Sequence, residues 1–237
     1  MSIVFNETTV TQIQMDGTTL QAVIYNGVPV FGSCAIFETS SAFMNDVMTI
    51  FGSGSVSSFQ RAPIADKPAS AVEVHAATSP LPIYAWKKTG TNIMCWASAA
   101  DIAFLNPESS GMFLGSDEFS VLPFYGASQI DFSGIYADLV ENAAAMFYGC
   151  HSLAQLNLGH WNTGRLAYAD EMFSGCTQLT TIYATDGLSL PSDATDVFVG
   201  CNHIVGGNGT VYSAGHVGAD YARIDREGSP GYFTAAS

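Results

Sequence analysis

Positive charge is scarce in this chain. The sequence holds 7 lysines and arginines against 21 aspartates and glutamates, and its formal net charge at pH 7 is −14. Proteins that bind nucleic acids carry a basic stripe, and basic clusters hold proteins on anionic membranes. The few basic residues here are scattered along the chain. The composition therefore predicts no nucleic-acid partner and no docking on an anionic membrane.

Long apolar runs are missing too. No stretch approaches the ~20 apolar residues of a membrane-spanning helix, so we expect no membrane insertion. The residues after Met1 have neither the basic start nor the apolar core of a secretory signal. If Met1 is the natural start, we expect the chain to leave the cell by a route other than general export. The alternative is a chain from which a signal has been removed.

Motifs for catalysis and metal binding are also absent. The chain has no G-x-S-x-G elbow, and its histidines lack the H-E-x-x-H spacing. No C-x-x-C pair suggests zinc, and the acid pair Asp170-Glu171 lacks the alternating oxygens of a calcium loop. Cys150-His151 could suggest a thiol–imidazole pair, but adjacent side chains rarely point together. We expect no enzyme, no metal and no cofactor.

The chain does contain a repeated phrase. Met146-Phe147-Tyr148-Gly149-Cys150 returns further along the chain as Met172-Phe173-Ser174-Gly175-Cys176. A weaker copy begins at Val197, after almost the same interval, and another at Met112, a longer interval upstream of Met146. Such self-similarity at a fixed period is typical of solenoids, which often present extended binding surfaces. The repeat therefore favours a binding protein over an enzyme.

Each phrase leads into the leucine-rich-repeat pattern L-x-x-L-x-L. Ile130, Leu156 and Ile182 share one position at a spacing of 26, so we expect them one above another in a parallel sheet. The Ala-rich stretches before Met146 and Met172 predict short helical turns. In-phase cysteines predict a buried ladder of thiols, although stacked strands also bring cysteines within reach of a disulfide. The predicted repeat core consists of Met112, Phe113, Ile130, Phe132, Met146, Phe147, Cys150, Leu153, Leu156, Leu158, Met172, Phe173, Cys176, Leu179, Ile182, Phe198 and Cys201.

The M-F-x-G-C-x-x-L phrase, Trp161-Asn162-Thr163 and the ending Gly206-Gly207-Asn208-Gly209-Thr210 resemble the BspA-like bacterial surface leucine-rich repeats. The closing stretch, residues 221–234, is similar to that family as well. The resemblance implies a leucine-rich-repeat solenoid of the kind found on bacterial surface proteins and in phage genomes, usually in adhesion. Repeats are few here and the third strand is weak at Ala184, so we expect a short recognition surface.

A second repeat, with a period of ten, begins at the N-terminus, where Ile3, Ile13 and Val23 correspond. Asp16-Gly17 and Asn26-Gly27 are strong signals for two-residue hairpin turns. These features predict a small β-meander over residues 2–31. So short a module cannot bury enough surface to be stable alone, and we expect a partner to hold it. It resembles the short N-terminal modules of phage virion and tail-associated proteins.

These observations predict a mixed, β-rich (α+β) fold in three parts. Residues 1–32 form a β-meander anchor, 33–100 a β-rich cap or connector, and 101–237 the leucine-rich-repeat solenoid with a C-terminal cap. Within the middle part, strands are expected near residues 71–75, 82–86 and 92–96, with a hairpin turn at 87–91.

The predicted function is that of a non-enzymatic surface protein of a bacteriophage virion, in a tail tip, fibre or head decoration. It would attach to a bacterial surface protein or glycan through the repeats and to other virion proteins through the N-terminal module, with a homo-oligomer as a further option. One alternative is a BspA-like adhesin at the bacterial cell surface. Another is a purely structural virion component.

The predicted binding residues are the x positions of the repeat strands, because side chains of a strand alternate between its two faces. A solvated sheet face has the same composition, so this assignment stays a hypothesis. The predicted face comprises Gln129, Asp131, Gln155, Asn157, Thr181 and Tyr183, with Trp161 and the loop at 119–126 near its edge.

Overall fold

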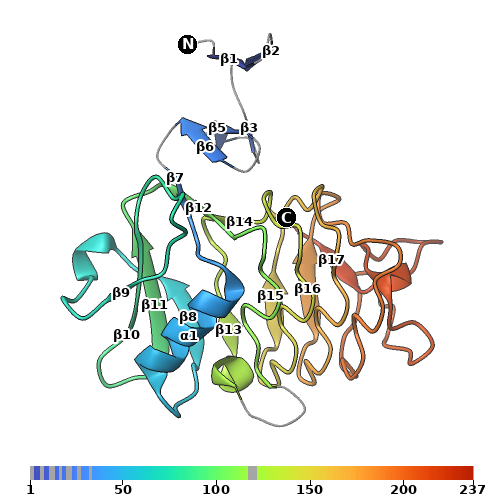
Figure 1. Cartoon of the computed structure of the whole chain (residues 1–237). Coiled ribbons are helices and arrows are strands. Elements are labelled where there is room, and N and C mark those ends of the chain that lie inside the picture. The colour runs from blue at the N-terminus through green and yellow to red at the C-terminus, as the bar shows by residue number, and fades with distance from the viewer. Residues whose placement is uncertain are drawn as a thin grey trace.

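The computed structural model describes residues 34–116 and 122–236, together with the backbone of six short strands within residues 1–31. The described residues form a β-rich fold with several sheets and a single α-helix (Figure 1). The mixed, β-rich class predicted from the sequence is therefore confirmed.

The six N-terminal strands form three hairpins. Each odd-numbered strand pairs antiparallel with the next one, and each pair is a sheet of its own. The described strands thus make separate hairpins and not one continuous meander, while the turn residues Asp16-Gly17 and Asn26-Gly27 lie outside the described residues. The strands are β1 (Ile3–Phe5), β2 (Thr8–Val10), β3 (Gln14–Met15), β4 (Thr18–Thr19), β5 (Val23–Tyr25) and β6 (Val28–Phe31).

Two sheets follow. One contains β9 (Val72–Glu73), β10 (Ile83–Lys87), β11 (Ile93–Ser98), β8 (Ser58–Arg61) and β13 (Gln129–Ile130), and the antiparallel pair β10–β11 flanks the turn expected at 87–91. The other contains β7 (Cys34–Ile36), β12 (Ile102–Phe104) and β14 (Ile135–Tyr136), all parallel. Both sheets thus combine strands from before and after residue 100.

The helix α1 (Ser40–Phe51) was not expected from the sequence. Its buried residues Phe43, Val47 and Phe51 are four apart, so they fall on one helical face. Phe43 packs edge-on against Phe59 of β8 and Phe113 of the first repeat phrase, at ring-centroid distances of 6.2 and 5.8 Å. The helix ends at Gly52, whose φ of 59° suits glycine.

The repeat strands β15 (Gln155–Asn157), β16 (Thr181–Ala184) and β17 (Phe233–Ala235) form a parallel sheet. Leu156 is level with Ile182, as the spacing of the repeat predicts, and Ile182 is level with Phe233. Ile130 is not hydrogen-bonded into this ladder, because β13 pairs with β8, where Phe59 lies beside Ile130. The first repeat strand therefore belongs to a different sheet from the second and third.

The M-F phrases stack on the opposite side of the core. Phe113, Phe147, Phe173 and Phe198 form a column with ring-centroid distances of 5.7, 5.5 and 5.7 Å and nearly parallel planes. The thiols of Cys150, Cys176 and Cys201 are free and buried, and each donates to the carbonyl oxygen of the phenylalanine one phrase earlier, at 3.0 to 3.1 Å. Every residue expected in the repeat core is buried, with an exposed fraction of 5 % or less.

No helix precedes the M-F phrases of Met146 and Met172, where short helical turns were expected: residues 144–145 form a turn, and Tyr168 forms a bridge to Asn142. The residue immediately before each phrase has left-handed backbone: Gly111, Ala145, Glu171 and Asp196 have φ between 54° and 63°. A right-handed helix cannot pass through such a residue, which is why the Ala-rich stretch stays a turn.

The C-terminal segment closes the repeat sheet. The strand beside β16 comes from residues 233–235, after a long excursion that includes η3 (Ala219–Tyr221). The buried carboxylate of Asp225 joins this segment to the Gly-rich ending, accepting from the backbone N–H groups of Asn208, Thr210 and Gly231 and the hydroxyl of Thr210. One cluster of buried side chains runs from Ala35 to Phe233, so the core is continuous across residue 100.

Candidate functional site

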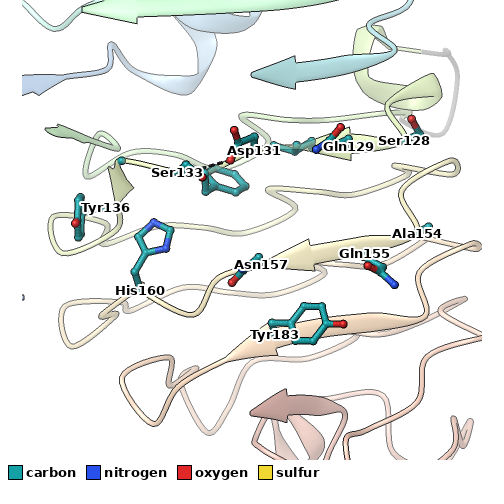
Figure 2. Close-up of a pocket in the computed structure, with 13 residues that line it drawn as sticks. Ser128, Gln129, Asp131, Ser133, Tyr136, Ala154, Gln155, Asn157, His160 and Tyr183 are labelled. Atoms are coloured by element: carbon teal, nitrogen blue, oxygen red, sulfur yellow. Dashed lines mark hydrogen bonds between the residues drawn. The ribbon is translucent and has the colours of Figure 1, made fainter. Parts of the chain in front are cut away.

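A groove of about 600 Å³ lies between β13 and β15, where the two sheets meet (Figure 2). Residues 128–134 and Tyr136 form one side of it. Ala154, Gln155, Asn157 and His160 form the other, with Tyr183 beyond them on β16. This volume falls within the roughly 300–1,000 Å³ of small-ligand pockets.

The groove exists because two neighbouring strands do not pair. Directly after β13, the Asp131 N–H donates to the carbonyl oxygen of Phe59, away from the groove. At the two ends of β15, Leu158 N–H donates to Tyr183 O, and Ala154 O accepts from Thr180 N–H. No backbone hydrogen bond joins β13 to β15, both of which are fully described.

The unpaired backbone groups follow from the alternation of a parallel ladder, in which successive residues address opposite neighbours. Since Asp131 faces β8, the N–H and C=O of Ile130 point across the groove. Since Ala154 and Leu158 face β16, the N–H and C=O groups of Gln155 and Asn157 point back toward Ile130. Both sides of the groove therefore present free hydrogen-bonding groups along their length.

Carboxamide side chains line the middle of the groove. The exposed side chains of Gln129 and Gln155 have no hydrogen-bond partner among the described residues, so both are available to a ligand. Asn157 Oδ1 accepts from Gly159 N–H at 3.0 Å, which leaves its amino group free to donate. Asp131 accepts from Ser133 N–H at 2.9 Å and is the one charged residue of the lining.

Aromatic rings close one end of the groove. His160 meets Tyr136 edge to face, with 5.2 Å between ring centroids, and its Nε2 lies 2.7 Å from the carbonyl oxygen of Ile135. That contact fixes the imidazole beside the groove. Figure 2 shows Tyr183 on the neighbouring strand with its ring alongside Asn157 and Gln155. The groove thus combines amide donors and acceptors with flat apolar surfaces.

Five of the seven side chains expected on the binding face line this groove: Gln129, Asp131, Gln155, Asn157 and Tyr183. Thr181 lies on the same strand as Tyr183 but outside the lining. Trp161 corrects the expectation of an edge residue, because it is buried at 1 % exposure and packs against Phe132 at 4.8 Å between ring centroids. The loop at 119–126 lies partly outside the described residues, and its residues Pro123–Gly126 form the turn η2 with Phe124 in the core.

Sequence reasoning missed the other polar lining residues, Ser128, Ser133, Tyr136 and His160. Ser128 and Ser133 lie near the ends of the repeat strand β13, and His160 follows β15 closely. Their nearness to these strands in the sequence could have indicated that they line the groove. The break between β13 and β15 could not be predicted from the sequence, because the repeat spacing continues unchanged from one strand to the next.

A second hollow, of about 500 Å³, is lined by Arg61, Trp86, Lys88 and Cys95 among others. Its arginine already has structural contacts. Arg61 donates to the carbonyl oxygens of Ala100 and Asp101, and its guanidinium lies over the Trp96 ring. Arg61 is thus occupied, and the first groove remains the better candidate.

Within the described part of the chain, no three His, Cys, Asp or Glu side chains gather as metal ligands would. None of the described helices has the length and apolar character to cross a membrane. No protein-family model, curated protein or solved structure matches this chain.

Proposed function

We propose that this chain is a non-enzymatic surface protein of a bacteriophage virion that attaches to the bacterial surface. In this proposal the stacked units form a leucine-rich-repeat solenoid of the BspA-like kind, and the groove between β13 and β15 is the centre of its recognition surface. The protein would lie in a tail tip, a fibre or a head decoration.

The observation that carries the proposal is the polar groove itself. It lies on the outward face of the repeat strands, where a large partner can reach it, and it offers unpaired amides beside aromatic rings. Its carboxylate and its imidazole are engaged with the backbone, Asp131 with Ser133 N–H and His160 with Ile135 O. No hydrogen bond among these described residues joins His160 to a serine hydroxyl, as a serine nucleophile with its base requires.

The N-terminal hairpins support placement in a larger assembly. Each described hairpin pairs only with itself, and an isolated two-stranded hairpin is marginally stable in water. A neighbouring virion subunit, or another copy of this chain, would supply the missing contacts.

The test has two arms. Antibodies against the purified protein are applied to particles that carry the gene and to the bacteria that host them, and fluorescently labelled protein is added to the same bacteria. We expect the antibodies to label the particles, the labelled protein to bind the cells, and the triple variant Gln155→Ala/Asn157→Ala/Tyr183→Ala to lose cell binding with its circular dichroism unchanged.

Other outcomes identify the alternatives. Antibody labelling of the bacterial surface without labelling of particles would show a cell-surface adhesin. Labelled particles with no binding of the wild-type protein to cells would show a structural virion component.

A further inference from the structure

We propose that the groove between β13 and β15 binds an uncharged saccharide, which lies across the break in the sheet. This inference rests on the proposed role in attachment and names the chemistry of the ligand. It follows from the width of the groove, its hydrogen-bonding groups and its charge.

The width of the groove excludes an added strand. Neighbouring strands lie about 4.8 Å apart, so two strands on either side of a third would be separated by about 9.6 Å. Cα atoms of β13 and β15 approach within 8 Å of each other. The strands do not pair, yet they lie too close together for a peptide backbone or a whole sugar ring to enter between them. A ligand therefore lies over the break, on the outer face of the sheet.

The unpaired backbone groups on the two sides of the groove are suited to hydrogen-bond with hydroxyl groups. Ile130 on one side and Gln155 and Asn157 on the other present both N–H donors and C=O acceptors toward the groove. A hydroxyl donates one hydrogen bond and accepts two, so the hydroxyls of one sugar ring can satisfy both kinds of group at once. The carboxamides of Gln129 and Gln155 add further donors and acceptors without a charge.

The aromatic rings and the charge of the lining further restrict the chemical class of the ligand. Tyr183 and His160 offer flat surfaces on which the C–H face of a sugar packs. The lining holds the carboxylate of Asp131 and no lysine or arginine, and the whole chain is strongly acidic. A sialylated, sulfated or phosphorylated sugar would be repelled, which favours an uncharged saccharide over an acidic one.

Binding is measured by calorimetry with a panel of short uncharged oligosaccharides of glucose, galactose, mannose and N-acetylglucosamine, beside an acidic sugar, sialyllactose. We expect Gln155→Ala and Asn157→Ala each to weaken binding roughly tenfold, as the loss of one well-placed hydrogen bond implies. Ala154→Phe, which keeps every polar group but fills the groove, should abolish binding. Thr181→Ala, on the same face but outside the groove, is the matched control and should bind as the wild type does.

A cell-binding arm covers a saccharide that the panel lacks. Bacteria are treated either with periodate, which destroys sugars, or with protease. Loss of wild-type binding after periodate supports the inference, provided that Ala154→Phe also fails to bind untreated cells.

Other outcomes contradict it. Binding that survives periodate and is lost after protease shows that the ligand is a protein and not a saccharide, and it leaves the attachment role intact. If untreated cells are not bound at all, the attachment role fails, and the panel alone decides whether the groove holds a sugar. The inference is overturned if the protein binds neither an oligosaccharide of the panel nor the cells. It is also overturned if Ala154→Phe binds as strongly as the wild type does.

Discussion

Three residues with side chains occupy left-handed backbone in the repeats: Ala145, Glu171 and Asp196, with φ of 54°, 56° and 55°. The equivalent residue of the first phrase is Gly111, for which this conformation is free of steric cost. For a residue with a Cβ the conformation costs roughly 1–2 kcal/mol. The three later phrases therefore store strain that the first one lacks.

Replacing Ala145 with glycine should release that strain. We expect Ala145→Gly to raise the free energy of unfolding by about 0.5–1 kcal/mol, the relief of strain being partly offset by the greater chain entropy of glycine. Ala144→Gly is the matched control, because the φ of Ala144 is not left-handed, and it should lower stability. Urea denaturation of both variants decides the matter, and a less stable Ala145→Gly protein contradicts the argument.

Asp225 carries the strongest electrostatic prediction at this scale. Burial acts to raise the pKa of its carboxyl, but hydrogen bonds from Thr210, Asn208 and Gly231 outweigh burial, and the pKa lies below its ordinary value. A depressed folded-state pKa means that the charge stabilises the protein above the unfolded pKa of about 3.9. That contribution is lost as the pH falls through the folded pKa.

We expect Asp225→Asn to cost about 2–4 kcal/mol at pH 7, since an amide group would face donors that the carboxylate satisfied. The difference in stability between variant and wild type should shrink below about pH 4. Thermal unfolding measured across pH checks this, with Asp193→Asn at an exposed site as the control. A difference that stays constant with pH would mean that the charge of Asp225 is irrelevant to stability.

At the scale of elements, the column of phenylalanines connects one unit to the next. Phe147 is fully buried between Phe113 and Phe173, and its ring also meets Phe132 at 5.8 Å. Truncation leaves a cavity that neighbours on both sides cannot fill. We expect Phe147→Ala to destabilise the protein by about 3–5 kcal/mol.

Tyr168→Ala is the control for that truncation, because Tyr168 is 61 % exposed, and its cost should stay within about 0.5 kcal/mol. Phe173→Ala should behave like Phe147→Ala. Unchanged melting temperatures for both phenylalanine variants would mean that the repeat has been phased wrongly.

The elements that could be predicted are those set by local pattern. Leu156 and Ile182 stack because the spacing of the repeat dictates it, and the hairpin of β10 and β11 follows from two apolar stretches on either side of a turn. The helix α1 left a fainter trace, the four-residue spacing of Phe43, Val47 and Phe51.

Long-range pairing could not be predicted. Nothing in the sequence indicates that β13 pairs with β8, which lies far earlier in the chain, or that β17 supplies the strand beside β16. The same limit applies to the site. Alternation placed Gln155 and Asn157 outward, but the groove depends on β13 pairing elsewhere, and Trp161 is buried because the large ring fills space beside Phe132.

At the scale of the whole molecule, the described parts differ in what holds them together. Residues 34–236 share a core that runs from Ala35 to Phe233 and joins strands from both ends of that stretch. Each of the described strand pairs β1–β2, β3–β4 and β5–β6 instead forms a sheet of its own. Stability should therefore reside in the first part and assembly in the second.

Deleting residues 1–31 separates these two roles. The shortened protein keeps β7 and every buried residue of the core within the described part of the chain, so its melting temperature should match that of the full chain. Binding to bacteria through the groove should also persist, whereas incorporation into particles should fail, because the hairpins are the proposed contact with other virion subunits.

Particles assembled with either chain are purified and probed with antibody, and the full chain carrying Tyr168→Ala serves as an assembly control. Efficient incorporation of the shortened chain would place the virion contact on the repeats, and a large loss of melting temperature would show that the hairpins support the core after all.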